Sequence, residues 1–334
     1  MVWYAPSCVL RFLFLFALTA HLWLTQVQPA QKQNVSEESK KLENDLKMPH
    51  ASMMCWAARE ERNPQRIEIL ISVCKESLRA NPPTAEVWVS LGLAYSQSGQ
   101  SEAAIQAYEE ALDLKHDDPE SWNNLGSLYE KTKRYDKAIQ CFWEAILLQP
   151  NFDRPRYGLG LALDNSGRFE EAVNSYREAI RINPYFHSAW NNLGVSYGHM
   201  HRYEDGIKSY REAIRLKPDF AVAWENLIAF YGKLGQNAEK IKACQDLTRV
   251  FPTSAQAWFW FGRALEEDKQ IEDAIKAYET ATNFAPKDAD IWFTLGLAYS
   301  TVDDQKKAAE VYKKLSKLDP AKAEELAKAS RSAS

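Results

Sequence analysis

Residues 119–152 read PESWNNLGSLYEKTKRYDKAIQCFWEAILLQPNF, and two residue types in this stretch show that the chain is built from repeats. Tryptophan stands at the fourth position and proline at the thirty-second, and both recur every 34 residues. The tryptophans of this grid are Trp88, Trp122, Trp190, Trp224, Trp258 and Trp292, and the prolines are Pro82, Pro150, Pro184, Pro218, Pro252, Pro286 and Pro320. Arg156 and His116 fill the two gaps. Because no insertion or deletion breaks this register between residues 85 and 320, the chain is a tandem array of one 34-residue unit.

Each unit contains two amphipathic segments joined by a short polar link, for example SWNNLGSLYEKT and YDKAIQCFWEAILL. Small residues at positions 8, 20 and 27 of the unit allow two helices to approach closely. Bulky residues at positions 4, 7, 11 and 24 fill the space around that contact. Proline at position 32 cannot continue the second helix and so helps to end it. One unit cannot bury its apolar stripe alone, so the pattern predicts helix pairs that stack on one another.

This pattern resembles that of the tetratricopeptide repeat (TPR) family. Residues 119–152 match it through Trp122, Leu125, Gly126, Tyr129, Ala138, Phe142, Ala145 and Pro150. Residues 187–220 match it with one change, Gly206 in place of alanine, and residues 289–322 carry it from Trp292 to Pro320. The resemblance implies an all-α fold, a right-handed α-solenoid of tandem 34-residue helix-turn-helix repeats.

The grid also predicts the boundaries of the segments. The full repeats are residues 85–118, 119–152, 153–186, 187–220, 221–254, 255–288 and 289–322, with a degenerate first repeat or cap over 51–84 and a C-terminal cap and tail over 323–334. Within 221–254, Ile228 replaces glycine, Lys240 replaces alanine and Cys244 replaces the aromatic residue. We therefore expect this degenerate repeat to pack less well than its neighbours.

The N-terminus has a different character. Residues 9–24, VLRFLFLFALTAHLWL, form an apolar run, and a polar linker over residues 31–50 follows. The length of the run favours a secretory signal peptide over residues 1–30, and the alternatives are an uncleaved anchor, a misassigned start or a buried segment. A signal or anchor would export the repeats to a periplasmic, secreted or luminal location, or hold them at a membrane through residues 9–28. Otherwise the protein is cytoplasmic.

The composition argues against several classes of function. The formal net charge is −4, whereas nucleic-acid binders normally present a basic surface. The five cysteines include no CxxC pair and none has histidines at zinc-ligand spacing, although Cys55 and Cys74 would face each other if their region folds as a helix hairpin. A glycine-rich phosphate loop, a GxSxG elbow and an HExxH helix are missing. We expect no enzyme activity, cofactor, metal, small-molecule substrate or nucleic-acid partner.

Four consecutive aromatic residues, 258 to 261, sweep most of the circumference of a helix, so they cannot all enter one core. Trp258 and Phe261 occupy core positions. The resemblance implies that positions 2, 5, 6, 9, 12 and 13 line a concave inner surface, which would carry Phe259, Trp260 and Phe293. These three rings would form an apolar patch whose polar rim includes Arg263, as is typical of interaction sites. The alternative is that one or two of the rings pack against an adjacent helix.

Asparagines gather on the same surface nearer the N-terminus. They occupy positions 5 and 6 of their repeats and comprise Asn123, Asn124, Asn191, Asn192 and Asn226. An amide both donates and accepts hydrogen bonds, so a row of asparagines can hold an extended chain. The row is similar to the asparagine ladder of O-linked N-acetylglucosamine transferase, but Gly158 breaks it. The alternative is a solvated polar face. The lysine that the family's carboxylate clamp needs at position 5 is missing from every repeat.

These observations predict a non-catalytic scaffold that binds a protein or peptide segment in its concave groove. One alternative is a structural or assembly subunit of a membrane-associated complex, which would use the convex faces and the ends of the array. A targeting arm for a separate enzyme is the other.

Overall fold

The computed structural model describes residues 63–80 and 82–332, and these residues form sixteen α-helices and no strands. Each 34-residue repeat supplies a first helix, here called A, and a second, called B. The A helices are α5 (Ala85–Gln97), α7 (Pro119–Lys131), α9 (Asp153–Asn165), α11 (His187–His199), α13 (Ala221–Lys233), α15 (Ala255–Glu267) and α17 (Ala289–Thr301). The B helices are α6 (Ser101–Leu114), α8 (Tyr135–Leu148), α10 (Phe169–Ile182), α12 (Tyr203–Leu216), α14 (Asn237–Val250), α16 (Ile271–Phe284) and α18 (Gln305–Leu318). α4 (Pro64–Ala80) precedes the pairs and α19 (Pro320–Ser332) follows them.

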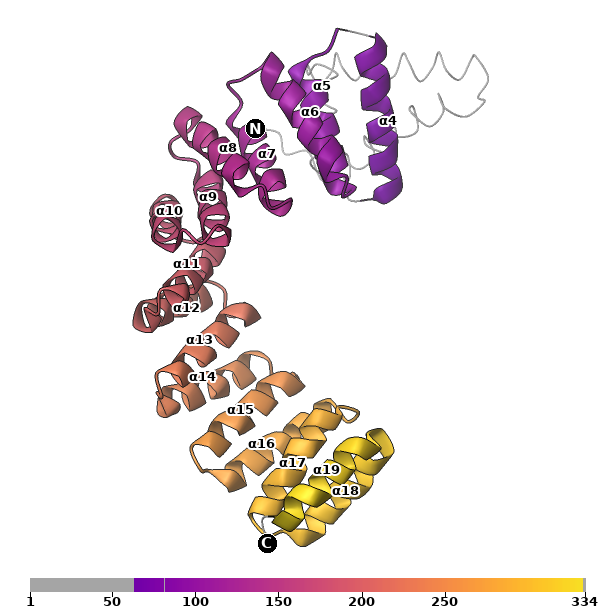
Figure 1. Cartoon of the computed structure of the whole chain (residues 1–334), viewed down its shortest axis with the longest axis vertical. Coiled ribbons are helices and arrows are strands. Elements are labelled where there is room, and N and C mark those ends of the chain that lie inside the picture. Colours follow the sequence, from indigo (N-terminus) through magenta and orange to yellow (C-terminus); the bar gives the residue numbers. More distant parts are fainter. Residues whose placement is uncertain (1–62, 81, 333–334) are drawn as a thin grey trace, which may run out of the picture. The chain divides into compact units, whose positions relative to one another are not determined.

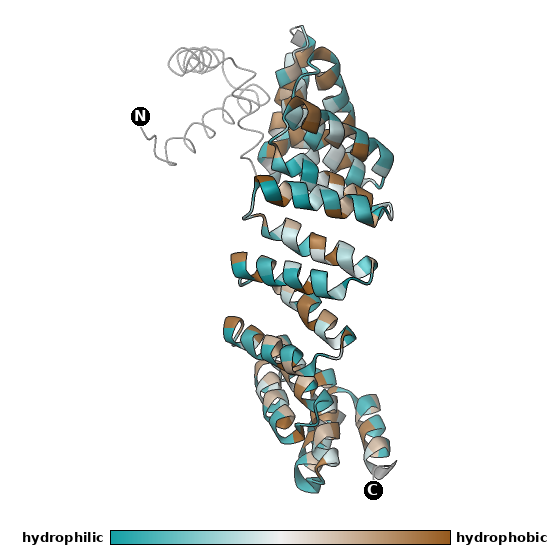
Figure 2. Ribbon diagram, turned by 90° about the vertical axis from the view of Figure 1, so that its left-hand side faces the viewer, coloured by the Kyte–Doolittle hydropathy of each residue, from teal (hydrophilic) through white to brown (hydrophobic). Residues whose placement is uncertain are grey.

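The helices belong to two compact units, an N-terminal unit that ends at Ile182 and a C-terminal unit that begins at Asn183. Within each unit, every A helix packs against the B helix of its own repeat, and every B helix packs against the next A helix (Figure 1). Hydrophobic and hydrophilic residues lie side by side along most helices, as amphipathic packing requires (Figure 2). The predicted all-helical array of paired helices is confirmed for the described residues.

The small residue at position 8 makes room for the ring at position 24. The Phe142 ring lies so close to Gly126 that a Cβ there would stand 2.8 Å from it, and a Cβ at Gly160 would stand 2.5 Å from Tyr176. Both rings are almost completely buried. Any larger side chain at position 8 would therefore separate the two helices or displace the ring.

The tryptophan grid is explained by one repeated hydrogen bond. In the described repeats 119–152 and 187–322, the indole N–H donates to the backbone carbonyl six residues earlier, in the turn that follows the preceding B helix, over 2.8–3.2 Å. Arg156, which replaces tryptophan, makes the same bond to the carbonyl of Pro150 through its guanidinium, at 2.8 Å. The sequence predicts these tryptophans as core residues, but only Trp224 is buried and the others are half-buried. Their indole stays near the surface because its partner is a backbone carbonyl in the turn between two repeats.

The degenerate repeat 221–254 shows the predicted looser packing. Ile228 fills the place of the usual glycine and Cys244 that of the usual ring, and both are buried. The large and small partners have thus exchanged places between the two helices. α13 and α14 nevertheless pack less extensively than the two helices of any other described repeat, because a β-branched side chain now stands where the helices would otherwise approach most closely.

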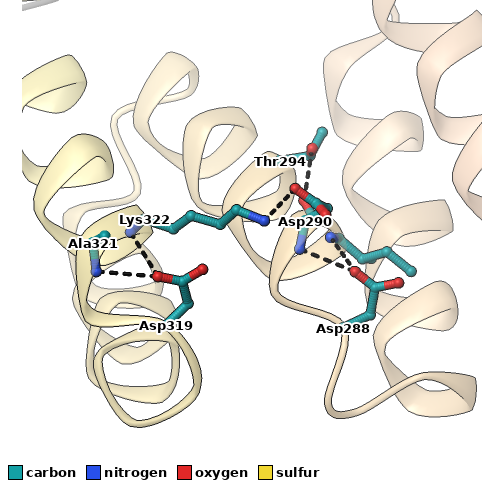
Figure 3. Close-up of polar contacts among 7 residues, drawn as sticks. Asp288, Asp290, Thr294, Asp319, Ala321 and Lys322 are labelled. Atoms are coloured by element: carbon teal, nitrogen blue, oxygen red, sulfur yellow. Dashed lines mark hydrogen bonds and ion pairs between the residues drawn. The ribbon is translucent and has the colours of Figure 1, made fainter.

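The last repeat departs from the pattern. The sequence predicts that Tyr312 at position 24 fills the core, but its side chain is 41% exposed. Leu326 of α19 lies against Gly296 in its place, 2.5 Å from where a Cβ would stand. Asp319 caps the start of α19, and Lys322 bridges to Asp290 of α17 at 2.5 Å (Figure 3). Leu326 of the capping helix and Val311 of α18 therefore occupy the space beside Gly296, and the Tyr312 ring is exposed.

Several predictions fall outside the described residues. These are the signal peptide or anchor over 1–30, the linker over 31–50, residues 51–62 and 81 of the degenerate repeat over 51–84, and with them Cys55. Cys74 lies in α4 and is completely buried. Among the helices that the structure describes, none combines the length and apolar character needed to cross a membrane.

Candidate functional site

The predicted groove residues all lie on A helices but belong to both units. Asn123 and Asn124 stand on α7 of the N-terminal unit. The C-terminal unit carries the others, namely Asn191 and Asn192 on α11, Asn226 on α13, Phe259, Trp260 and Arg263 on α15, and Phe293 on α17.

The asparagine pair of the N-terminal unit has a structural task. The Asn123 side-chain N–H donates to Oδ1 of Asn124 at 3.5 Å, and the Asn124 side-chain N–H donates to the Tyr108 hydroxyl at 3.2 Å. Asn124 is half-buried, so it is not simply a solvated side chain. It holds the ring at position 24 of the preceding repeat by its hydroxyl.

The C-terminal unit contains a chain of three amides. The Asn226 side-chain N–H donates to Oδ1 of Asn191 at 3.2 Å, and the Asn191 side-chain N–H donates to Oδ1 of Asn192 at 3.0 Å. Asn191 is 5% exposed, whereas the other two are half-buried. An amide has two N–H donors and a carbonyl with two acceptor sites. The bond to Asn191 therefore fixes the orientation of Asn226 and uses only one of its donors.

The aromatic residues of the predicted patch are half-buried and divide between two cores. Trp260 packs against the buried cluster of α13 and α14. Phe259 and Phe293 pack against the cluster built by α16, α17 and their neighbours, and the Phe259 ring centroid lies 5.7 Å from that of Tyr278. Each of the three rings thus packs in part against neighbouring helices. Only the outer edges of the rings remain for a partner.

The polar rim of these rings contains two carboxylates with partners inside the unit. The Tyr278 hydroxyl donates to Glu266 at 2.7 Å, and burial together with this carboxylate raises the pKa of Tyr278, which keeps the hydroxyl protonated. Lys240 bridges to Glu267 at 2.5 Å. Arg263 is exposed beside them. Of the rim groups, Arg263 is the one best placed to pair with a carboxylate of a partner.

The structure also shows two clefts that the sequence did not predict. One has a volume of 590 Å³, lies between α12 and α14, and has Trp224, Leu227 and Tyr231 of α13 on its wall. The other has a volume of 400 Å³ and repeats the arrangement between α14 and α16. Both border α14, the B helix of the loosely packed repeat. The signal in the sequence is the set of substitutions in 221–254, which predicted weak packing but not the open space.

The chemical groups of the described residues support binding. None of these residues forms a group of three or more histidines, cysteines, aspartates or glutamates that could hold a metal. Burial raises the pKa of the Cys141 and Cys244 thiols to about 12, so neither is a thiolate near neutral pH. The candidate site consists of amides, ring edges and one exposed guanidinium, which suits recognition of a polypeptide.

Comparison with known families agrees with the paired helices. A tetratricopeptide repeat model matches residues 119–152 and 187–220, and another matches residues 289–322. A further TPR repeat model matches residues 92–133, 165–200 and 262–302. The chain is a TPR repeat protein. The matched segments stop at residue 220 and resume at 262, so they leave out the degenerate repeat.

Solved structures of other TPR proteins resemble this TPR protein over about half of its length. MamA is 25% identical, with 49% of this chain and 96% of MamA covered and a TM-score of 0.46. MamA from Desulfovibrio magneticus RS-1 is 21% identical, with 51% and 96% covered and a TM-score of 0.43. YrrB, described as a TPR protein with an unusual peptide-binding site, is 20% identical, with 57% and 99% covered and a TM-score of 0.46. No curated protein matches the sequence.

Proposed function

We propose that this TPR protein is a non-catalytic scaffold whose C-terminal unit holds an extended protein segment along the A helices α11, α13, α15 and α17. TPR domains in general imply protein–protein interaction. The observation that carries the finer proposal is the amide chain from Asn226 through Asn191 to Asn192.

The amide chain suits a polypeptide backbone. Asn226 keeps one N–H and its carbonyl for another partner, and its bond to Asn191 at 3.2 Å already fixes its rotamer. A preorganised side chain loses less conformational entropy when it binds. The exposed residues Ala229 and Gly232 follow on α13, and they carry no long side chains that would keep a backbone away. A peptide N–H and C=O can therefore reach the Asn226 amide.

The aromatic edges supply the second part of the site. Trp260 follows on α15, the next A helix, and the packing of its inner side against α13 and α14 holds the ring in place. Held aromatic rings are common anchors at interfaces because they bind without much loss of freedom. We expect a partner segment with an apolar side chain for this ring and a carboxylate for Arg263.

The first experiment introduces a photocrosslinking amino acid at Ala229 of the full chain and identifies the captured segment. The same amino acid at Gln245 on α14 is the control for non-specific capture. A synthetic peptide of the captured segment is then titrated against the purified protein. Asn226→Ala and Trp260→Ala should each weaken the affinity about tenfold or more.

Asn124→Ala provides the matched control in this titration. It removes the same amide at the same repeat position, but in the N-terminal unit, and should leave the affinity unchanged. Thermal melts of all three variants separate loss of binding from loss of folding. Equal affinities for the native protein, Asn226→Ala and Trp260→Ala would refute the proposed site.

The proposed location rests on the apolar run of residues 9–24. We propose that this run exports the repeats or anchors them at a membrane. Fractionation of a tagged full-length chain tests this. Recovery of the intact chain, with residues 1–30 attached, from the soluble cytosol would contradict it.

A further inference from the structure

The B helix α8 carries an apolar stripe on its outer surface. Trp143 and Leu147 lie one helical turn apart, so they share a face, and their side chains are 49% and 70% exposed. Leu148 beside them is 39% exposed. Scattered apolar residues are normal on a protein surface, but an exposed tryptophan next to an exposed leucine is typical of an interaction site. We call Trp143 and Leu147 the α8 stripe.

Charged rows of opposite sign flank the α8 stripe. The residues at the same two repeat positions are Glu109 and Asp113 on α6, and Arg177 and Arg181 on α10. All four are exposed. α6, α8 and α10 follow one another in the N-terminal unit (Figure 1). The surface is therefore acidic on α6, apolar on α8 and basic on α10.

Two of these four charges have partners inside the chain that the structure identifies. Glu109 accepts a hydrogen bond from the Tyr129 hydroxyl, and Arg181 bridges to Glu178 of its own helix at 3.0 Å. That bridge joins two exposed side chains three residues apart, and such pairs contribute little to stability. Arg181 can therefore exchange Glu178 for a carboxylate of a partner at low cost.

We propose that the α8 stripe is the centre of a homodimer interface. A two-fold axis that runs parallel to α8 between the two stripes lays each α8 on the α8 of the second copy. The same rotation places α6 of one copy over α10 of the other, so Asp113 faces Arg181 of the second copy in both halves. A two-fold interface uses one patch twice and closes without further growth.

The order of the charges selects a second copy as the occupant. A rotation about an axis across the helices would instead oppose the two acidic rows, so the charges also fix the orientation. A different protein would need its own apolar stripe between a basic and an acidic row in the matching order. This chain already has that surface, because an acidic–apolar–basic row is complementary to itself under the proposed rotation.

Analytical ultracentrifugation of the full chain measures the dimer directly. The native protein should form dimers at micromolar concentrations, and Trp143→Ser and Leu147→Ser should each raise the dissociation constant about tenfold or more. Phe284→Ser is the matched control, since Phe284 is also an exposed ring, 44% accessible, on another B helix. It should leave the dimer intact.

A charge exchange tests the orientation. Asp113→Arg alone places arginines opposite Arg181, and Arg181→Glu alone places glutamate opposite Asp113, so each variant should be monomeric. An equal mixture of the two should form a heterodimer, because both halves of the interface then pair opposite charges. Circular dichroism confirms that each variant is folded.

Three results would overturn the proposal. They are a native protein that stays monomeric at about 100 µM, a dimer that Trp143→Ser does not weaken, and single charge variants that the mixture does not restore. In the first case the stripe would remain for a different protein, and binding of the captured segment in the C-terminal unit would be unaffected.

Discussion

Gly206→Ala offers the sharpest test of the packing, because sequence and structure predict opposite signs. Alanine is the usual residue at this position of the repeat, and it favours a helix over glycine by up to about 1 kcal/mol. The sequence pattern alone would therefore predict stabilisation. In the structure, a Cβ at Gly206 would stand 2.5 Å from Cε2 of Phe230, about 1 Å closer than ordinary van der Waals contact.

The Phe230 ring has little room to move aside. It is 7% exposed, and its centroid lies 5.2 Å from that of Tyr203 and 5.0 Å from that of Tyr210. On another side, a Cβ at Gly198 would stand 2.4 Å from the ring. Overpacking of this kind costs about 1–3 kcal/mol. After subtraction of the helix propensity, Gly206→Ala should lower the free energy of unfolding by about 1–2 kcal/mol.

A double-mutant cycle measured by urea unfolding isolates this contact. Phe230→Leu introduces the residue that Leu128 provides at the same position of another repeat. In that background, Gly206→Ala should become neutral or stabilising, which gives a coupling of about 2 kcal/mol. Gly232→Ala is the control, since its Cβ would stand 3.6 Å from the nearest atom, and it should not destabilise. Stabilisation by Gly206→Ala in both backgrounds would refute the reasoning.

Three further predictions concern the same unit. In urea titrations, Trp260→Ala should lower the free energy of unfolding by about 2 kcal/mol and Trp258→Ala by about 3 kcal/mol. Both rings are half-buried, but Trp258→Ala also removes a hydrogen bond of 2.9 Å to a backbone carbonyl. A larger loss in Trp260→Ala would contradict this. Iodoacetamide should label Cys244 faster than Cys141, as measured by peptide mapping. Both thiols have a pKa of about 12, but only Cys244 lies in the loosely packed repeat. Equal labelling rates would count against weak packing. A tyrosine hydroxyl and a lysine ammonium lower the pKa of Glu279. Its contribution to stability should therefore be present above the ordinary glutamate pKa of about 4.3, and it should be lost as the pH falls through the lower pKa of the folded protein. Glu279→Gln should remove this part of the acid dependence of the melting temperature, and an unchanged profile would show that the carboxylate contributes nothing.

The helix pairs were predictable from the sequence because their signals are local and repeated. Glycine at position 8 meets a ring at position 24 in the repeats 85–118, 119–152, 153–186, 187–220 and 255–288, so their 34-residue period predicts both the helices and the contact between them. The weakness of the degenerate repeat was predictable for the same reason, since Ile228 and Cys244 break that pair. The grid also predicted where each helix pair begins, but it did not predict that most tryptophans stay half-buried.

The remaining features depend on contacts between residues that the repeat pattern does not relate. Leu326 takes the place of Tyr312 beside Gly296 because α19, the C-terminal cap, packs against α17 as well as α18, and no full repeat provides this contact. The clefts beside α14 depend on the distances between α14 and the neighbouring B helices, α12 and α16. The residue types in the sequence do not determine these distances directly. The opposite charge rows beside the α8 stripe are visible in the sequence, but their meaning appears only when Trp143 and Leu147 are found exposed.

The asparagine row shows how a functional hypothesis and a packing rule can use the same residues. Position 6 of a repeat meets position 24 of the repeat before it. Asn124 donates to the hydroxyl of Tyr108, whereas Gly158 leaves space for Phe142, whose ring would lie 2.4 Å from a Cβ there. A phenylalanine has no hydroxyl to hold, so an amide at residue 158 would have no polar partner and would overlap the ring. The break in the row therefore follows from the ring type and not from a loss of peptide binding.

The contact between position 6 of a repeat and position 24 of the repeat before it gives Trp260 a second role. By register, Trp260 stands opposite Cys244, the small residue that replaces a ring in the degenerate repeat, and it packs against the cluster that contains Cys244. The large side chain at position 6 thus replaces part of the volume missing at position 24. Its inner side belongs to the fold, and only its outer edge can serve a partner. In Trp260→Ala, only the loss of affinity beyond that caused by the unfolded fraction of the variant is evidence for the groove. Asn226→Ala tests the groove without removing a ring from the core.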